Sequence, residues 1–138
     1  MKTFATVHAI AQNIQGEILV LQRAKMRERA GKWNCVTGFI KERESAEDAA
    51  LRELKEETGL VGALVKTAKP HWVDHDGARW ILVPSLIRVT DTSSLQIDAL
   101  ESQSYRWILP TDPDVKKMIS LNKSLELLGL LPNNIPSA

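Results

Sequence analysis

The stretch from Gly38 to Leu60 constrains this chain most, because it gathers several carboxylates on a short loop and on the helix expected after it. At a helical period of about 100° per residue, Glu53, Glu56 and Glu57 fall on neighbouring rows of one face. Carboxylates this close together repel one another strongly unless protons or cations neutralise them. Oxygen ligands at this density suit a hard divalent ion such as Mg²⁺ or Mn²⁺.

Local signals at both ends define this helix. Ser45 followed three residues later by Asp48 is typical of a capped start, and Gly59 suits the left-handed residue that closes a helix. The sequence therefore predicts a helix over residues 46–58. Gly38 and Glu44 precede it, on a loop that can fold back over the acidic face.

A solvated acidic face is the alternative interpretation, because charged helical rows usually face water. Ala46, Ala49 and Ala50 lie beside the acids, however, and small residues let other backbone approach closely. Lys55 is the single lysine of the helix, so the balanced glutamate–lysine pairs of a solvated helix are missing. We therefore expect the acids to face protein instead of open water.

The segment resembles the signature of the Nudix hydrolases: a glycine, five residues, a glutamate, seven residues, then Arg-Glu-hydrophobic-x-Glu-Glu-x-Gly-hydrophobic. Every specified position is present, namely Gly38, Glu44, Arg52, Glu53, Leu54, Glu56, Glu57, Gly59 and Leu60. Weaker likenesses flank it, WNCVTG from Trp33 and ESQSYRWI from Glu101. The resemblance implies an α/β fold, the Nudix α/β/α sandwich with a mixed β-sheet between helices.

By motif position, the resemblance implies that Glu56 and Glu57 are the principal metal ligands, assisted by a backbone carbonyl near Gly38. Glu53 would be a further ligand or the catalytic base, and Glu56 also belongs to the expected catalytic group. The base stays open, because family members differ. Thr37 stands where many members carry a second glycine, which leaves open which carbonyl reaches the metal.

Three further residues complete the expected site. The resemblance implies that Arg52 orients a neighbouring carboxylate and that Glu44 supports the loop. Glu101 is a candidate additional metal ligand or base, reached from another part of the fold, and an exposed loop acid is an equally weighted alternative. The QRAKMRERAGK run is basic, and Arg23 is its candidate for binding a substrate phosphate, since arginine suits phosphate geometry. Solvated surface charge is again an equal alternative.

The chemistry implied is attack of water on a phosphorus anhydride. Metal ions neutralise the phosphate oxygens and lower the pKa of a bound water, and a carboxylate can take the proton. No serine or cysteine with a partnered base is evident, so no covalent intermediate is expected. The resemblance implies Mg²⁺- or Mn²⁺-dependent cleavage of a nucleoside diphosphate linked to another group, foremost a nucleoside triphosphate giving monophosphate and pyrophosphate.

Other functions stay open. The VTG run is similar to that of pyrophosphatases acting on dihydroneopterin triphosphate, whereas ESQSYRWI is similar to a run in dinucleoside polyphosphate hydrolases. Nucleotide sugars, ADP-ribose and a capped RNA end are further alternatives. A non-catalytic nucleotide-sensing module is an alternative of another class, and the complete set of motif acids argues against it. RNA binding has thin support from one basic loop and seven aromatic residues.

The composition of the 138-residue chain fits one globular domain, 1–138, with 43% hydrophobic and 25% charged residues. A net charge of +1 gives no general attraction to nucleic acid or an anionic membrane, so we expect a small nucleotide as the partner. The lone Cys35 fits a core thiol and a reducing, cytoplasmic location. No apolar run is long enough for a membrane span. A homodimer stays open.

The remaining elements follow from local patterns. Strands are expected at 4–11 and 17–21 around a Gly16 turn, at 33–40, in the apolar runs 63–73 and 78–89 around Asp76-Gly77, and at 105–109. A last helix begins after Asp112, is interrupted near Asn122, ends at Gly129 and leaves a tail with Pro132 and Pro136. His8 is interpreted as an inert sheet residue, and His71–Asp76 as a hairpin tip instead of a metal site. Trp72 and Trp80 are interpreted as core or sheet residues, with base stacking as the alternative.

Overall fold

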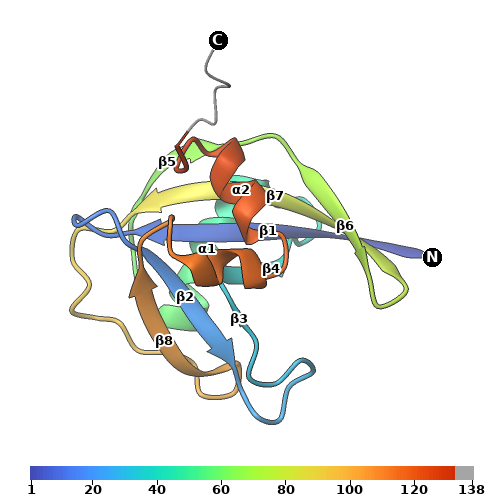
Figure 1. Cartoon of the computed structure of the whole chain (residues 1–138), viewed down its shortest axis with the longest axis horizontal. Helices are drawn as coiled ribbons and strands as arrows, with labels where there is room; N and C mark the ends of the chain where they lie inside the picture. The colour runs from blue at the N-terminus through green and yellow to red at the C-terminus, as the bar shows by residue number, and fades with distance from the viewer. Residues whose placement is uncertain (133–138) are drawn as a thin grey trace.

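In the computed structural model, residues 1–132 are described, and they form a mixed β-sheet with helices against it (Figure 1). The strands are β1 (Lys2–Gln12), β2 (Ile18–Arg23), β3 (Trp33–Asn34), β4 (Val36–Phe39), β5 (Ala63–Thr67), β6 (His71–His75), β7 (Ala78–Arg88) and β8 (Ser102–Ile108). The helices are α1 (Ala46–Thr58), the 3₁₀ helix η1 (Pro113–Lys117) and α2 (Leu121–Leu127).

Strand β1 is the centre of the sheet. It pairs in parallel with β7 along its whole length and antiparallel with β4, where Val7 lies opposite Gly38. Strand β2 leaves β1 after the Gln12–Ile18 pair and continues beside β8 and β3. The sheet therefore has two arms: β2, β3 and β8 form one, and β1, β4, β5, β6 and β7 form the other.

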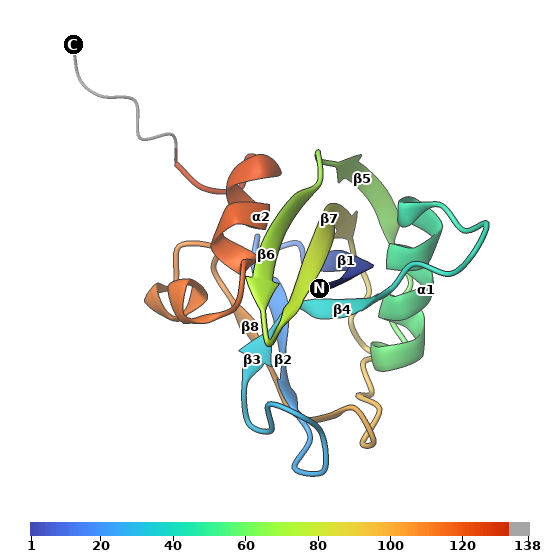
Figure 2. The same cartoon turned by 90° about the vertical axis from the view of Figure 1, so that its right-hand side faces the viewer.

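The helices cover opposite faces, which confirms the predicted α/β/α sandwich (Figure 2). Successive β1 side chains alternate between faces. Val7 and Ala9 pack with Leu54 of α1 in one apolar cluster, and Ile10 packs with Leu125 of α2 in the other. Residues from Val7 to Ala11 are all buried, as expected for a strand covered on both faces.

Helix α1 has the predicted bounds. The Ser45 hydroxyl accepts a hydrogen bond from the Asp48 N–H at 3.1 Å, and such a cap is worth about 1 kcal/mol. At the other end Gly59 has a φ of 72°, and its N–H donates to the Lys55 carbonyl at 2.8 Å. Both ends are therefore fixed by residues adjacent to the helix.

The predicted turns are confirmed. Asp76 and Gly77 have φ values of 51° and 73°, and they join β6 to β7 in a two-residue hairpin. Gly16, with a φ of 80°, lies in the turn between β1 and β2. His71 and His75 lie at the two ends of β6, in the strand of this hairpin.

Three predicted elements differ from the structure. The strand expected at 33–40 is two strands, because the Asn34 side chain accepts from the Cys35 N–H and interrupts the pairing there. The run 63–73 is divided between β5 and β6 by the Ala68–Pro70 segment. Strand β8 begins at Ser102, three residues earlier than the 105–109 expectation.

The final helix is also divided. The 3₁₀ helix η1 ends at Lys117, where Met118 is extended, and Ser120, with a left-handed φ of 60°, precedes α2, so the interruption precedes Asn122. Gly129, with a φ of 75°, follows the end of α2 as expected. The Pro136 expectation lies outside the described residues. None of the helices within residues 1–132 has the length and apolar character needed to cross a membrane.

Candidate active site

Arg52 connects the acids of α1 to the loop in front of it. Its Nε and one terminal nitrogen donate to the two carboxylate oxygens of Glu44, at 2.7 and 2.9 Å. The other terminal nitrogen donates to Glu53 at 2.9 Å and to Glu56 at 3.1 Å. A further bond reaches the Phe39 carbonyl at 3.0 Å. One guanidinium therefore holds three of the motif acids.

This network shifts the pKa values of its members. The hydrogen bonds from Arg52 lower the pKa of Glu44 to about 2. They oppose the effect of burial at Glu53, but burial is larger and raises the Glu53 pKa. Glu44 is thus held as an anion, whereas Glu53 lies in a site that disfavours its charge.

Glu57 is the least compensated acid of the group. Its Oε2 is buried and, among residues 1–132, has no hydrogen-bond partner. Burial first, and then the charges of Glu53 and Glu101, raise the Glu57 pKa to about 9. A buried carboxylate oxygen without a donor is costly, so this position favours either a proton or a cation.

Gly38 lies directly against Glu53. A Cβ at Gly38 would overlap the Glu53 carboxyl group, so β4 passes closer to α1 than any side chain would permit. The neighbouring helix residues Ala49 and Ala50 are fully buried, in agreement with the predicted close approach. The glycine is therefore required by space and not by its φ angle.

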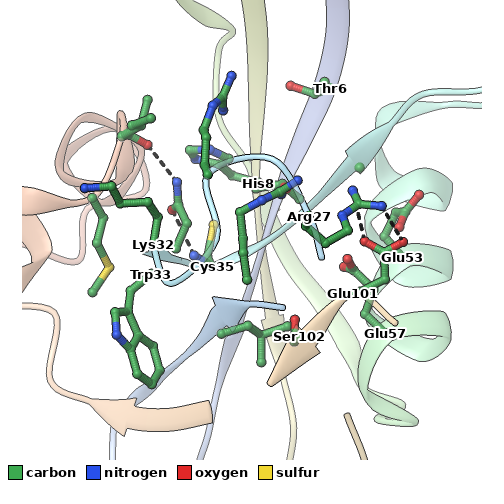
Figure 3. A pocket seen from close by; sticks show the side chains of 18 of the residues that line it. Thr6, His8, Arg27, Lys32, Trp33, Cys35, Glu53, Glu57, Glu101 and Ser102 are labelled. Carbon is green, nitrogen blue, oxygen red and sulfur yellow. Dashed lines mark hydrogen bonds and ion pairs between the residues drawn. The ribbon is translucent and has the colours of Figure 1, made fainter. Parts of the chain in front are cut away.

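Glu101 meets the acidic group from the segment that precedes β8. Glu53, Glu57 and Glu101 gather on one side of the cavity, and Trp33 and Cys35 lie on the other (Figure 3). Arg27 from the basic loop forms a two-pronged ion pair with Glu101, with both N–O distances at 3.2 Å. Arg27 thus connects the basic loop to the acids, although residues 25–28 of that loop are exposed.

The acids line one end of a cleft of about 1100 Å³ between the two arms of the sheet. Its wall is also rich in cations: Arg23, Arg27, Arg29, Lys32, Arg106 and Lys117. Arg23 is half-buried, its Nε donates to the Glu28 carbonyl at 2.8 Å, and burial lowers its pKa. A cleft with acids at one end and several cations along its wall suits a metal–phosphate ligand.

A comparison with known protein families identifies the family of this chain. The NUDIX domain model matches residues 2–126, which is most of the chain. The chain belongs to the Nudix family.

Two curated Nudix relatives share part of the sequence. The RNA pyrophosphohydrolase of Gluconacetobacter diazotrophicus is 37% identical over 51% of this chain and 45% of its own length. The CTP pyrophosphohydrolase of Escherichia coli is 34% identical over 51% of this chain and 52% of its own length. The aligned parts thus span about half of each of these relatives.

A solved structure shows the same fold. The Ap4A hydrolase of Caenorhabditis elegans superposes with a TM-score of 0.75, covering 91% of this chain and 95% of its own, at 17% identity. At that identity, the likeness is evidence of the fold and leaves the substrate open.

The Nudix segment offers a donor set that suits a divalent ion. All its candidate ligands are oxygens, on Glu53, Glu56, Glu57 and Glu101 and on the backbone near Gly38, as a hard cation prefers. Within residues 1–132 no three acid, histidine or cysteine side chains already meet as a coordination site. Arg52 and Arg27 pair with Glu53, Glu56 and Glu101 instead, and the buried Oε2 of Glu57 is left in a position that favours a proton or a cation.

One expectation about the Nudix acids is wrong in part. Glu53 and Glu44 each have 15% of the side chain exposed, but Glu56 has 54% exposed and faces open water. Glu56 lies one helical turn beyond Arg52. All three acids line the cleft, and Glu56 is the more exposed of the acids that bond to Arg52.

Sequence reasoning missed two features of this Nudix cleft. The first is the cationic contribution of Arg106 and Lys117, which come from β8 and η1 and share no motif with the basic loop. The second is His8, which is fully buried, lines the cleft and bonds to Ser124. No local pattern indicates a contact between residues 116 positions apart.

Proposed function

We propose that this protein is a divalent-metal-dependent hydrolase that cleaves the pyrophosphate bond of a nucleoside diphosphate linked to another group. The first-choice substrate is a nucleoside triphosphate, giving the monophosphate and pyrophosphate. The observation that carries the proposal is the buried, partnerless Oε2 of Glu57 at the acidic end of a cation-lined cleft. The similarity to a CTP pyrophosphohydrolase and an RNA pyrophosphohydrolase supports the same class of reaction.

Mg²⁺ or Mn²⁺, when bound, would neutralise phosphate oxygens and lower the pKa of water at the site. Glu56 and Glu57 would hold it, with Glu53, Glu101 and a carbonyl near Gly38 as further donors. Arg52 sets the position of Glu53 and Glu56, because it bonds to both. Glu44 in turn fixes Arg52, so a misplaced loop would misplace the ligands.

The remaining residues would bind the substrate phosphates and accept a proton from water. A carboxylate of the motif, with Glu53 or Glu56 as the candidates, accepts the proton of the attacking water. The new bond joins the water oxygen to phosphorus, and the bond from that phosphorus to the leaving phosphate oxygen breaks. Arg23 and Lys32 line the cleft and would offset the charge of the phosphates.

A substrate panel tests this function. Nucleoside triphosphates, dinucleoside polyphosphates, nucleotide sugars, ADP-ribose and 5′-triphosphorylated or capped RNA are incubated with Mg²⁺ or with chelator, and products are identified by mass. We expect Mg²⁺-dependent release of a nucleoside monophosphate and pyrophosphate. In ¹⁸O-labelled water, the label should enter one phosphate product.

The outcomes separate the alternatives. Hydrolysis of a different member of the panel would change the assigned substrate but not the class of reaction. Binding of nucleotides without hydrolysis of any member would favour the sensing module, and absence of label from every phosphorus product would exclude attack of water on phosphorus.

A further inference from the structure

Three side chains from distant segments form a buried chain of hydrogen bonds behind the cleft. His8 of β1 bonds through Nδ1 to the Ser124 hydroxyl of α2 at 2.8 Å. The same hydroxyl bonds to Nε2 of His71 in β6 at 2.7 Å. Ser124 is fully buried, and His71 is partly exposed at the outer end. The chain therefore runs from the outside of the protein to the cleft wall.

One ring nitrogen of His8, Nε2, has no hydrogen-bond partner among the described residues. Its side chain is 1% exposed and lines the cavity. Among the described residues, Nδ1 has a protein partner and Nε2 has none. Among the described residues, Glu57 Oε2 is the one side-chain polar atom that is both inaccessible to solvent and without a hydrogen-bond partner. Because Nε2 of His8 also has no partner but is not such an atom, it is accessible and belongs to the small exposed part of His8. This nitrogen is reached from the cavity.

The cavity lining near His8 includes both apolar and polar side chains. Leu21, Cys35, Leu82 and Met118 line the cavity together with His8. Pockets that bind small molecules typically combine apolar side chains with a few placed polar groups that fix the orientation of the ligand.

Two of the polar neighbours already form side-chain hydrogen bonds, whereas Thr37, which lies opposite His8 on β4, also lines the cavity. The Thr6 hydroxyl donates to the Ile81 carbonyl at 3.0 Å. The Asn34 amide donates to the Ile119 carbonyl at 3.0 Å, and its oxygen accepts from the Cys35 N–H. These bonds fix the orientation of Thr6 and Asn34, whereas Nε2 of His8 has no protein partner among the described residues.

The hydroxyl of Ser124 couples the two imidazoles, because it carries one proton and can donate along one of its two bonds. When it donates to His71, Nδ1 of His8 carries hydrogen and Nε2 is an acceptor. When it donates to His8, Nε2 carries hydrogen and is a donor. The burial that lowers the His8 pKa to about 3 keeps the ring neutral in both arrangements.

We infer that His8 is a specificity-determining residue whose Nε2 hydrogen-bonds the nucleobase of the bound nucleotide, and that Ser124 and His71 set whether it donates or accepts. This inference rests on the proposed function, because it requires a nucleotide in the cleft with its phosphates at the acidic end. His8 touches the substrate, whereas Ser124 and His71 are positioning residues that act through His8.

The test compares binding of molecules with and without a base. The probes are the α,β-methylene forms of the four nucleoside triphosphates and of ribose 5′-triphosphate, titrated with Mg²⁺ against tryptophan fluorescence. His8→Asn keeps an amide where Nδ1 lies but has no atom at Nε2. We expect it to weaken the best-bound nucleoside triphosphate about tenfold and to leave ribose 5′-triphosphate unchanged. His8→Gln, which places an amide near Nε2, should restore part of the difference.

Ser124→Ala and His71→Asn provide a second route if His8→Asn does not fold. Each should reduce discrimination among the four bases without changing the affinity for ribose 5′-triphosphate. Asn122→Ala is the matched control, because Asn122 lies on α2 near Ser124, bonds to Glu126 and does not line the cavity. It should leave discrimination unchanged.

Equal losses for the base-containing and base-free probes, or no loss in any variant, would overturn the inference and leave the hydrolase proposal standing. A wild-type protein that binds none of the five probes would overturn the inference, while the substrate panel judges the proposed function independently. Because the analogues are not hydrolysed, failure of turnover and failure of base recognition are read separately.

Discussion

Arg52 and Glu44 form a two-pronged ion pair, with N–O distances of 2.7 and 2.9 Å, between the helix and the loop that precedes it. A lysine at position 52 would keep the charge but could not bond at once to Glu44, Glu53 and Glu56. We therefore predict that Arg52→Lys lowers kcat/KM by about 10–100-fold, as expected when a residue that orients ligands is lost.

Steady-state kinetics with the best substrate of the panel measure this loss, and circular dichroism confirms that the helix remains. Lys55→Arg, on the same helix but exposed and outside the network, is the matched control. Near-normal kcat/KM in Arg52→Lys would show that orientation by the guanidinium is unimportant.

Gly38→Ala tests the close approach of β4 to α1. The added Cβ would overlap the Glu53 carboxyl group, so Glu53 or the strand must move. We predict a destabilisation of about 1–3 kcal/mol together with a large loss of activity, measured by urea unfolding and by kinetics. Gly16→Ala is the control: its φ of 80° makes alanine strained, but no atom lies near, so stability alone should fall.

The features found from the sequence are those that neighbouring residues determine. Ser45 and Gly59 bound α1, and Asp76-Gly77 forms the hairpin turn, because capping and positive φ depend on one or two residues. The spacing of the Nudix motif likewise predicts that Glu53 and Glu57 lie on one helix face, because residues four apart are neighbours on a helix.

The features that were missed depend on contacts distant in sequence. The Arg27–Glu101 pair joins residues 74 positions apart, and no pattern near either residue indicates the other. His8 lies in an apolar strand and is typical of an inert sheet residue until α2 brings Ser124 against it. The interruption at Cys35 also depends on a side-chain bond from Asn34 that strand propensity does not include.

Arg27→Ala tests whether the basic loop competes with the metal. Removal of the guanidinium frees Glu101 of its ion pair, so Mn²⁺ should bind the protein a few-fold more tightly, as fits an exposed pair worth about 0–1 kcal/mol. Loss of a cation beside the phosphates should raise the substrate KM. Mn²⁺ titration by electron paramagnetic resonance measures the first effect.

Arg79→Ala removes a comparable exposed pair, with Asp74 on the β6–β7 hairpin, and should change neither quantity. Equal Mn²⁺ affinity in wild type and Arg27→Ala would mean that Arg27 does not compete for Glu101.

His8 should make the protein sensitive to acid. Its pKa is about 3 in the folded protein against about 6.5 for an unperturbed histidine. Below pH 6.5 the unfolded chain therefore binds a proton that the folded protein does not, so stability present above pH 6.5 is lost as pH falls toward 3. The free energy of unfolding should decline by about 1.4 kcal/mol per pH unit more in wild type than in His8→Asn.

Urea unfolding of both proteins at pH 7.5, 5.5 and 4.5 measures the difference in slope. Parallel pH profiles would show that His8 is not a buried neutral group in the folded state.

Glu57 carries the central claim that these acids hold a divalent ion. The decisive measurement is an equilibrium Mn²⁺ titration, followed by electron paramagnetic resonance, of wild type and Glu57→Gln at one pH, with Mg²⁺-dependent hydrolysis measured on the same samples. We predict that the variant folds, binds Mn²⁺ at least about tenfold more weakly and loses turnover, because the glutamine keeps the shape but not the charge. Wild-type Mn²⁺ affinity and turnover in Glu57→Gln would contradict the account.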